Sequence, residues 1–132
     1  MELYQPMMNY RKLSVLIVDD NRFYIDRMTA MLNDLEGVGQ INTAENYKEA
    51  FTQIGTVEHD LVLLDIHLPD GNGLNLLKQI KGSPVRTEVI MVSNSSDDFY
   101  RRQSKELGAY YFLDKTNDFE MMPAILSEMN SC

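Results

Sequence analysis

Polar side chains that can bind a cation or a phosphate stand at or just behind the ends of several short apolar runs. They are Asp19 and Asp20 after residues 13–18, Asp65 after residues 61–64, Ser93 after residues 89–92 and Lys115 after residues 110–113. Clustered carboxylates raise one another's pKa unless a cation lies among them, and Mg²⁺ is the oxygen-preferring ion common beside phosphate. A carboxylate can attack phosphorus, while a lysine and a hydroxyl stabilise the phosphoryl oxygens. These residue types therefore predict phosphoryl chemistry, provided that the fold brings them together.

The elements that must position these residues form an alternating pattern. Five apolar segments, at residues 13–18, 40–44, 61–64, 89–92 and 110–113, are each followed by a segment of helical character. The first, third and fourth show little alternation, as expected of strands that are buried on both faces of a parallel sheet. The weaker second and fifth are predicted at the edges. The pattern predicts a doubly wound α/β domain with a five-stranded parallel sheet of strand order 2-1-3-4-5.

Apolar stripes and capping residues mark the helices between these strands. A spacing of three to four predicts two amphipathic helices, on Ile25, Met28, Leu32 and Leu35 and on Leu74, Leu77 and Ile80. Asn46 with Glu49, and Ser95 with Asp98, resemble capping boxes. Gly108 is predicted to end the fourth helix, and Pro123 fits the first turn of a last helix over residues 122–129.

Each candidate residue also has an ordinary structural explanation. The run Asp19, Asp20 and Asn21 can cap a helix, Asp65 can open a turn, Ser93 can be a turn hydroxyl and Lys115 a surface cation. In this architecture, however, ligands bind at the carboxyl ends of the strands, where all five candidates are expected. Their joint placement favours a functional site. Asp70 and Asp118 are interpreted as turn residues, and His59 is expected at the surface.

The ordered set of motifs resembles the receiver domain of bacterial response regulators, from about Leu13 to the C-terminus. The resemblance is carried by Asp19-Asp20, the run from Leu63 to Gly73 around Asp65, Val92-Ser93, Gly108-Ala109 and Lys115. It implies a flavodoxin-like fold in which Asp65 is the phosphoacceptor. It also implies that Mg²⁺ is bound directly by Asp20, Asp65 and the backbone carbonyl of His67, and by Asp19 mainly through a water.

The resemblance further implies a switch formed by Ser93, Lys115 and Phe112. Ser93 is the hydroxyl that closes on the phosphoryl group, Lys115 pairs with that group, and Phe112 is the aromatic switch residue. Two positions depart from the usual family pattern. Thr116 follows the lysine where the family mostly has proline after a cis peptide, and Phe112 replaces a tyrosine.

The function implied is that of a phosphoacceptor in two-component signal transduction. A histidine kinase or a histidine phosphotransfer protein is the expected donor. The domain is no conventional enzyme, but it is expected to catalyse its own Mg²⁺-dependent phosphorylation and dephosphorylation. A downstream protein target is expected to bind the fourth helix, fifth strand and fifth helix. A terminal adaptor and an intermediate of a phosphorelay both remain open.

Bulk properties restrict the alternatives. The chain has 132 residues and a net charge of −8, which argues against direct binding to nucleic acid. No apolar run is long enough to cross a bilayer, and the single cysteine, Cys132, fits a reducing cytoplasm. We expect a short leader over residues 1–12 and one receiver domain over residues 13–132. The short stretch after Lys115 has room for one helix and not for an output domain.

Two rival functions are retained for comparison. The first is a receiver-like interaction module that works without phosphorylation, and the presence of all five site residues, Asp19, Asp20, Asp65, Ser93 and Lys115, argues against it. The second is a small phosphatase with an aspartyl nucleophile, whose Asp-x-Asp pattern differs from Asp65-Ile66-His67. A nucleotide-binding site is not supported, because Gly71-Asn72-Gly73 lacks the rest of a glycine-rich pattern.

Overall fold

Five parallel strands form the central sheet of the computed structural model, which describes residues 11–94 and 98–130. The strands are β1 (Leu13–Val18), β2 (Val38–Ala44), β3 (Leu61–Asp65), β6 (Glu88–Ser93) and β7 (Tyr111–Asp114), and their order is β2-β1-β3-β6-β7. In chain order this is the predicted arrangement 2-1-3-4-5. The three inner strands are almost entirely buried, whereas β2 and β7 at the edges are partly exposed. Only strands covered on both faces need a continuous apolar run.

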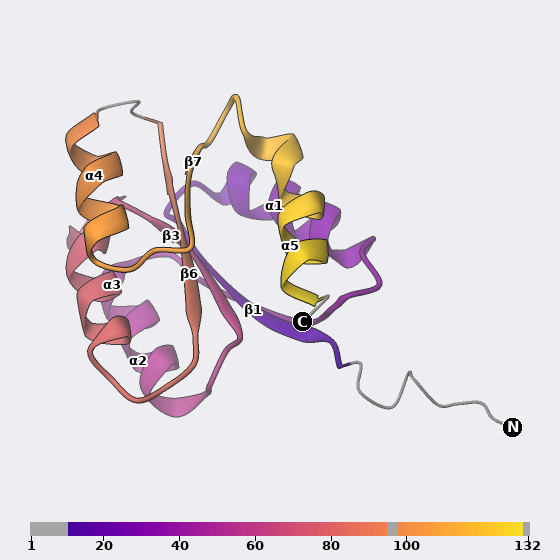
Figure 1. The fold of residues 1–132 in the computed structure, drawn as a ribbon, viewed down its shortest axis with the longest axis horizontal. Helices are drawn as coiled ribbons and strands as arrows, with labels where there is room; N and C mark the ends of the chain where they lie inside the picture. The colour runs from indigo at the N-terminus through magenta and orange to yellow at the C-terminus, as the bar shows by residue number, and fades with distance from the viewer. Residues whose placement is uncertain (1–10, 95–97, 131–132) are drawn as a thin grey trace, which may run out of the picture.

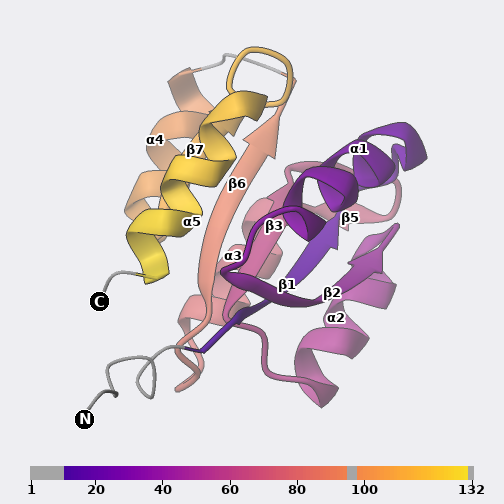
Figure 2. The ribbon, with the colours of Figure 1, turned by 90° about the vertical axis from the view of Figure 1, so that its right-hand side faces the viewer.

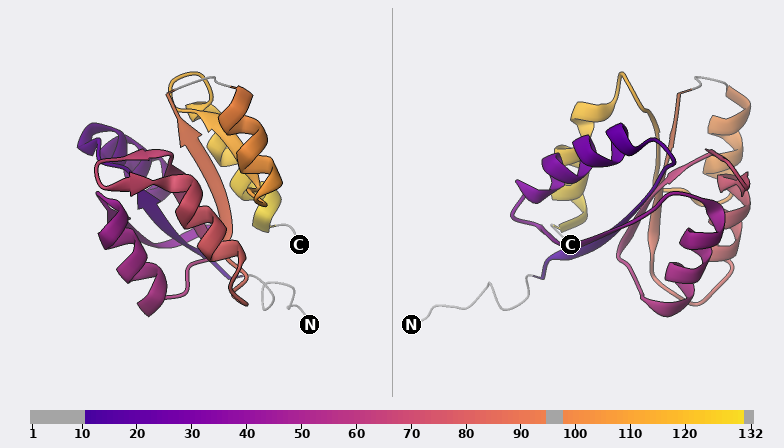
Figure 3. Two further views of the ribbon diagram at one scale, coloured as in Figure 1. Left: turned by 90° about the vertical axis from the view of Figure 1, so that its left-hand side faces the viewer. Right: turned by 180° about the vertical axis from the view of Figure 1, so that it is seen from behind.

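Helices cover both faces of the sheet (Figures 1 and 2). One face carries α1 (Arg22–Asn33) and α5 (Met122–Asn130), and the other carries α2 (Tyr47–Thr56), α3 (Gly73–Lys81) and α4 (Asp98–Glu106), as the two views of Figure 3 show. Successive side chains of β1 pack on opposite faces of the sheet. Ile17 packs with α1 and α5, while Leu16 packs with α2 and α3. No helix in the described part of the chain is long and apolar enough to span a membrane.

Three local features differ from the sequence prediction. The turn after β3 contains a two-stranded antiparallel ribbon, β4 (His67–Leu68) with β5 (Gly71–Asn72), which was not predicted. A 3₁₀ helix, η2 (Phe119–Met121), precedes α5. Helix α1 ends at Asn33, two positions before Leu35, the last residue of the predicted stripe, although Leu35 still packs against the core.

Helix α4 ends at Glu106, and Gly108 terminates it from two residues further on, as predicted. The Ala109 N–H donates to Ser104 O at 2.9 Å and the Gly108 N–H to Lys105 O at 3.1 Å, which is the Schellman pattern. Gly108 has φ +98°, a left-handed conformation that side chains disfavour. Within α4 only Ser104 is buried, so this helix is weakly anchored. The predicted cap at Ser95 lies outside the described residues.

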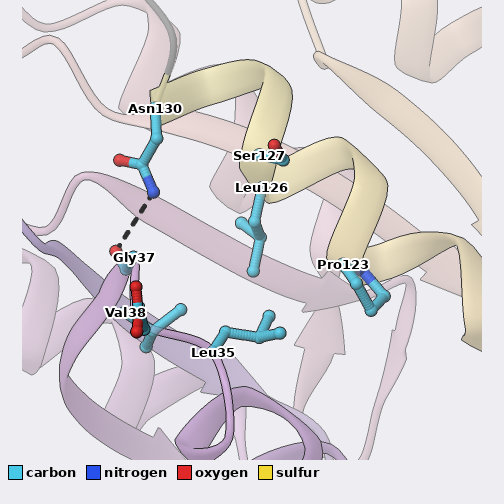
Figure 4. A pocket seen from close by; sticks show the side chains of 8 residues that line it. Leu35, Gly37, Val38, Pro123, Leu126, Ser127 and Asn130 are labelled. Carbon is cyan, nitrogen blue, oxygen red and sulfur yellow. Dashed lines mark hydrogen bonds between the residues drawn. The ribbon is translucent and has the colours of Figure 1, made fainter.

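A cavity of about 380 Å³ opens between α5 and the loop that joins α1 to β2 (Figure 4). Val38 and Leu126 contribute apolar surface, and the Asn130 side-chain amide donates to Gly37 O at 3.3 Å. The same carbonyl accepts from the Leu13 N–H at 2.8 Å. The cavity therefore lies beside the start of β1, at the opposite end of the strand from the acidic residues.

Candidate functional site

Three carboxylates meet at the carboxyl ends of β1 and β3. Asp19 and Asp20 follow the last residue of β1, and Asp65 is the last residue of β3. One ligand oxygen of each lies within 4.8 Å of the others. Asp19 and Asp65 are buried, at 1% and 6% exposure, whereas Asp20 is exposed. The parallel pairing of β1 with β3 brings together the acids that the sequence placed 45 or more positions apart.

The loop after β1 directs these acids toward the site because another residue caps α1. The Asn21 side-chain oxygen accepts the Tyr24 N–H at 3.2 Å, and Asp19 Oδ1 accepts the Asn21 N–H at 2.8 Å. The Asp19 N–H itself donates to Ala44 O of β2 at 3.0 Å. Asn21 therefore satisfies the helix terminus, and the ordinary explanation of Asp19 and Asp20 as caps does not apply.

Lys115 reaches the acids from the end of β7. Its Nζ lies 2.6 Å from Asp19 Oδ2 and 3.5 Å from Asp65 Oδ2, and its side chain is 8% exposed. A buried ammonium beside two buried carboxylates partly compensates their desolvation. The prediction that the lysine reaches the site is confirmed.

The loop behind Lys115 is held without the usual proline. Asp114 Oδ1 accepts the N–H groups of Thr116 and Asn117, both at 2.8 Å. Asp118 Oδ2 in turn accepts the Asp114 N–H at 2.9 Å, which confirms Asp118 as a turn residue. Every peptide bond in the described residues is trans, including the one between Lys115 and Thr116. The loop after Lys115 therefore lacks the cis peptide that is usual in the family.

The electrostatics of the site favour the binding of a cation. Burial, and secondarily the Asp19 charge, raise the pKa of Asp65 to about 6, although Lys115 and the His67 N–H act in the opposite direction. Buried Asp19 Oδ2 has no aligned hydrogen-bond donor among the described residues and is faced by the Lys115 ammonium. Three carboxylates with one compensating ammonium form an oxygen-rich, under-neutralised cluster. This donor set fits a hard divalent cation such as Mg²⁺.

Gly73 allows the loop after β3 to fold back on the end of that strand. Its N–H donates to Ile66 O at 2.7 Å, and an added Cβ would lie 2.2 Å from Asp65 O. No side chain fits at such a separation, so glycine is required by close backbone approach. Nearby, Asp70 accepts the N–H groups of Tyr47 and Lys48 at 2.6 and 3.1 Å, which confirms its structural assignment.

The His67 side chain contacts α4. Its ring meets Tyr100 edge to face with centroids 5.1 Å apart, and the side chain is exposed. The potential metal-ligand group found among the described residues contains Asp19, Asp20 and Asp65 and no imidazole. The use of the His67 backbone carbonyl as a metal ligand stays a prediction.

Ser93 lies on β6, the neighbour of β3, and Phe112 lies on the edge strand β7. Ser93 is the fully buried last residue of β6, and its carbonyl accepts the Lys115 N–H at 2.9 Å. Phe112 in β7 is half-buried, and the Arg101 guanidinium carbon lies 4.8 Å from its ring centroid. An arginine of α4 is thus in contact with the predicted switch aromatic.

His59 is buried, so its predicted surface position is wrong. It is 3% exposed, its Nε2 lies 3.0 Å from the Asn42 amide nitrogen, and its carbonyl accepts the Thr87 hydroxyl at 2.7 Å. It precedes β3, and therefore lies at the opposite end of that strand from Asp65. The contacts of His59 are made by residues of β2 and of the segment before β6. The sequence around His59 contains no local pattern that predicts them.

Tyr24 is a residue of the site that the sequence did not reveal. The Lys115 Nζ lies 4.9 Å from the centroid of its ring. Burial, with the Asp19 and Asp65 charges, raises the pKa of the Tyr24 hydroxyl, so this residue stays neutral. The one available signal is an aromatic residue in the first turn of the helix that follows the acidic pair.

Comparison with known proteins agrees with this arrangement. The family model of the response regulator receiver domain matches residues 15–127. The chain belongs to the response regulator receiver family. A protein-glutamate methylesterase/protein-glutamine glutaminase of Desulfotalea psychrophila is 34% identical to this receiver over 110 residues, which are 82% of this chain and 30% of that protein. The probable C4-dicarboxylate response regulator DctR of Priestia megaterium is 29% identical over 94% of this chain and 54% of its own length.

Solved receiver structures share the fold. The signal receiver domain of a DNA binding response regulator from Colwellia psychrerythraea aligns with a TM-score of 0.84 at 25% identity, covering 89% of this chain and 98% of that one. A CheY-like receiver domain protein of Methanospirillum hungatei aligns with a TM-score of 0.81 at 25% identity, covering 90% of this chain and 94% of that one. This receiver spans about half or less of the length of the two curated relatives named above.

Proposed function

We propose that this receiver accepts a phosphoryl group on Asp65 in a Mg²⁺-dependent reaction and thereby switches a protein-binding surface. One observation carries the proposal. A buried carboxylate, Asp65, shares the end of the sheet with Asp19, Asp20 and Lys115, and the oxygens of the three acids lie within 4.8 Å of one another.

The phosphoryl donor is a phosphohistidine of a histidine kinase or of a phosphotransfer protein. An Asp65 oxygen attacks phosphorus in line with the leaving nitrogen, so that a P–O bond forms as the P–N bond breaks. The released imidazole takes up a proton from solvent. Hydrolysis of the acyl phosphate later returns the Asp65 carboxylate and inorganic phosphate.

The residues around Asp65 provide the charge that this reaction requires. Asp20, Asp65 and the His67 carbonyl would hold Mg²⁺, and Asp19 would add its carboxylate charge beside them. When bound, the ion neutralises acid and phosphoryl charge. The Lys115 ammonium, 3.5 Å from Asp65 Oδ2, pairs with a phosphoryl oxygen. The Ser93 hydroxyl donates a hydrogen bond to another phosphoryl oxygen.

The output of the switch is a change of surface at α4, β7 and α5. Movement of Ser93 toward the phosphoryl group gives Phe112 room to turn inward, which changes its contact with Arg101 of α4. Since α4 has a single buried residue, little packing opposes its displacement. A downstream protein that prefers the shifted arrangement then binds more tightly.

The test is the intact mass of the protein after incubation with Mg²⁺ and acetyl phosphate. One labile phosphoryl adduct is expected on the wild type and none on Asp65→Asn or after chelation of Mg²⁺. Asp70→Asn is the matched control, because Asp70 caps α2 away from the acidic cluster, and it should still form the adduct.

Absence of an adduct on folded wild-type protein would favour an interaction module that works without phosphorylation. Steady hydrolysis of a generic phosphate ester would instead indicate a phosphatase. If the adduct forms, transfer from it to histidine-containing partner proteins separates a relay intermediate from a terminal adaptor.

A further inference from the structure

The aromatic face of Tyr24 lies against the Lys115 ammonium. The Lys115 Nζ is 4.9 Å from the ring centroid, and both side chains are 8% exposed. A cation over a tyrosine face is attracted by the ring quadrupole, and the attraction grows when water is excluded. The ammonium thus has two kinds of partner, the carboxylates of Asp19 and Asp65 and the ring of Tyr24.

The ring is itself held in place from two directions. The Tyr24 backbone N–H is bound by the Asn21 side chain, which links the residue to the loop that carries the acids. Its ring packs edge to face against Phe119, with centroids 6.2 Å apart and planes at 79°. The Arg27 guanidinium carbon lies 4.2 Å above the Phe119 ring. The Tyr24 ring is therefore packed against Phe119, and its backbone is tied to the loop that carries the acids.

The Tyr24 face adds a restraint to the two ion pairs that Lys115 makes. A lysine is a point charge on a flexible four-carbon stem, so its ammonium has no intrinsic preferred position. Thr116 follows it, and the loop is fixed through the Asp114 carboxylate, which binds backbone N–H groups and does not touch the ammonium. The aromatic face restricts where the ammonium can lie beside Asp65.

We infer that Tyr24 is a positioning residue, which holds the Lys115 ammonium beside Asp65 for phosphoryl transfer. The inference rests on the proposed function, and it assigns the role to the ring face and not to the hydroxyl. The hydroxyl is therefore dispensable and the aromatic face is not.

Three variants test this inference at saturating Mg²⁺ with acetyl phosphate as donor. Tyr24→Phe keeps the face and should phosphorylate within about twofold of the wild-type rate, whereas Tyr24→Leu should be roughly 3- to 30-fold slower. Phe23→Leu is the matched control, because Phe23 is the neighbouring aromatic of α1 and is 72% exposed. It should leave the rate unchanged. Thermal unfolding establishes that each variant is folded.

A wild-type rate in Tyr24→Leu would overturn the inference, and so would an equal loss in Tyr24→Phe and Tyr24→Leu. A wild type that forms no adduct would defeat the proposed function instead, which is a different result.

An NMR measurement tests the contact between the Tyr24 ring and the Lys115 side chain even if Tyr24→Leu does not fold. The ε-methylene protons of Lys115, assigned with Lys115→Arg, should be shifted upfield by the ring in the wild type and in Tyr24→Phe. Unshifted protons in the folded wild type would show that the ring does not hold the lysine.

Discussion

Lys115 lies closer to Asp19 than to the proposed phosphoacceptor Asp65. The distances from its Nζ are 2.6 Å to Asp19 Oδ2 and 3.5 Å to Asp65 Oδ2. Asp19 is 1% exposed, so its charge depends on this ammonium for compensation. The lysine therefore stabilises the buried acid and is at the same time within reach of Asp65.

Lys115→Met should destabilise the metal-free protein strongly. Removing one partner of a buried ion pair leaves the other charge uncompensated, which costs about 3–5 kcal/mol of unfolding free energy. Urea unfolding in the presence of a chelator measures this. Lys105→Met, on the exposed side of α4, should change stability by no more than about 0.5 kcal/mol. Adding Asp19→Asn to Lys115→Met should recover part of the loss, and no recovery would argue against the pair.

Asp65→Asn should stabilise the metal-free protein at neutral pH. The Asp65 pKa is raised from 3.8 to about 6, so the folded state binds more protons than the unfolded chain between these values. The free energy of unfolding therefore falls as pH rises through this window, and the variant, which lacks the charge, should gain about 1–3 kcal/mol above it. Urea unfolding at several pH values measures the difference, which should shrink toward pH 4.

The effect of Asp70→Asn on stability should be opposite in sign to that of Asp65→Asn. The backbone N–H groups of Tyr47 and Lys48 lower the pKa of Asp70, so its charged form is favoured by folding. This variant should not gain stability at neutral pH. A gain equal to that of Asp65→Asn would show that the effect is not specific to the cluster.

His59 should make the protein less stable in mild acid. Burial lowers the pKa of His59 below its ordinary 6.5, an effect that nearby Asp60 partly opposes. Because the unfolded chain then binds a proton that the folded protein refuses, stability falls as pH drops below about 6.5 and levels off below the folded pKa. The stability of His59→Gln should vary less over this range. Equal profiles for the variant and the wild type would contradict the prediction.

Gly108→Ala should destabilise the end of α4. With φ +98° the residue is left-handed, and a side chain there costs about 1–2 kcal/mol. Gly55→Ala is the matched control, because Gly55 lies in α2 with open space around its Cβ position. Alanine there should instead stabilise by roughly 0.5–1 kcal/mol through helix propensity. Thermal or urea unfolding of the two variants gives the comparison.

Much of the fold could be predicted from local sequence pattern. Residues 13–18, 61–64 and 89–92 are apolar without alternation, because a parallel strand covered by helices on both faces has no solvent side. The edge positions of β2 and β7 followed from weaker patterns by the same reasoning. The ribbon of β4 with β5 could not be predicted, because two-residue strands leave no periodicity to detect.

The candidate site, like the fold, could be predicted from the sequence only in part. Asp19, Asp65 and Lys115 could be placed at one edge, because each follows a strand and parallel strands end together. The burial of His59 by Asn42 and Thr87 could not, because the contacts join separate elements.

The amino-acid sequence by itself determined which residues stand at the carboxyl ends of the strands, and with them the kind of chemistry that we propose for this receiver. Strand periodicity and chain direction are local properties, so they can be read along the chain. Only the tertiary structure decided that Lys115 pairs first with Asp19 and lies over the ring of Tyr24. That choice depends on how α1, β3 and β7 pack together, and side-chain distances across packed elements are not encoded in any one segment.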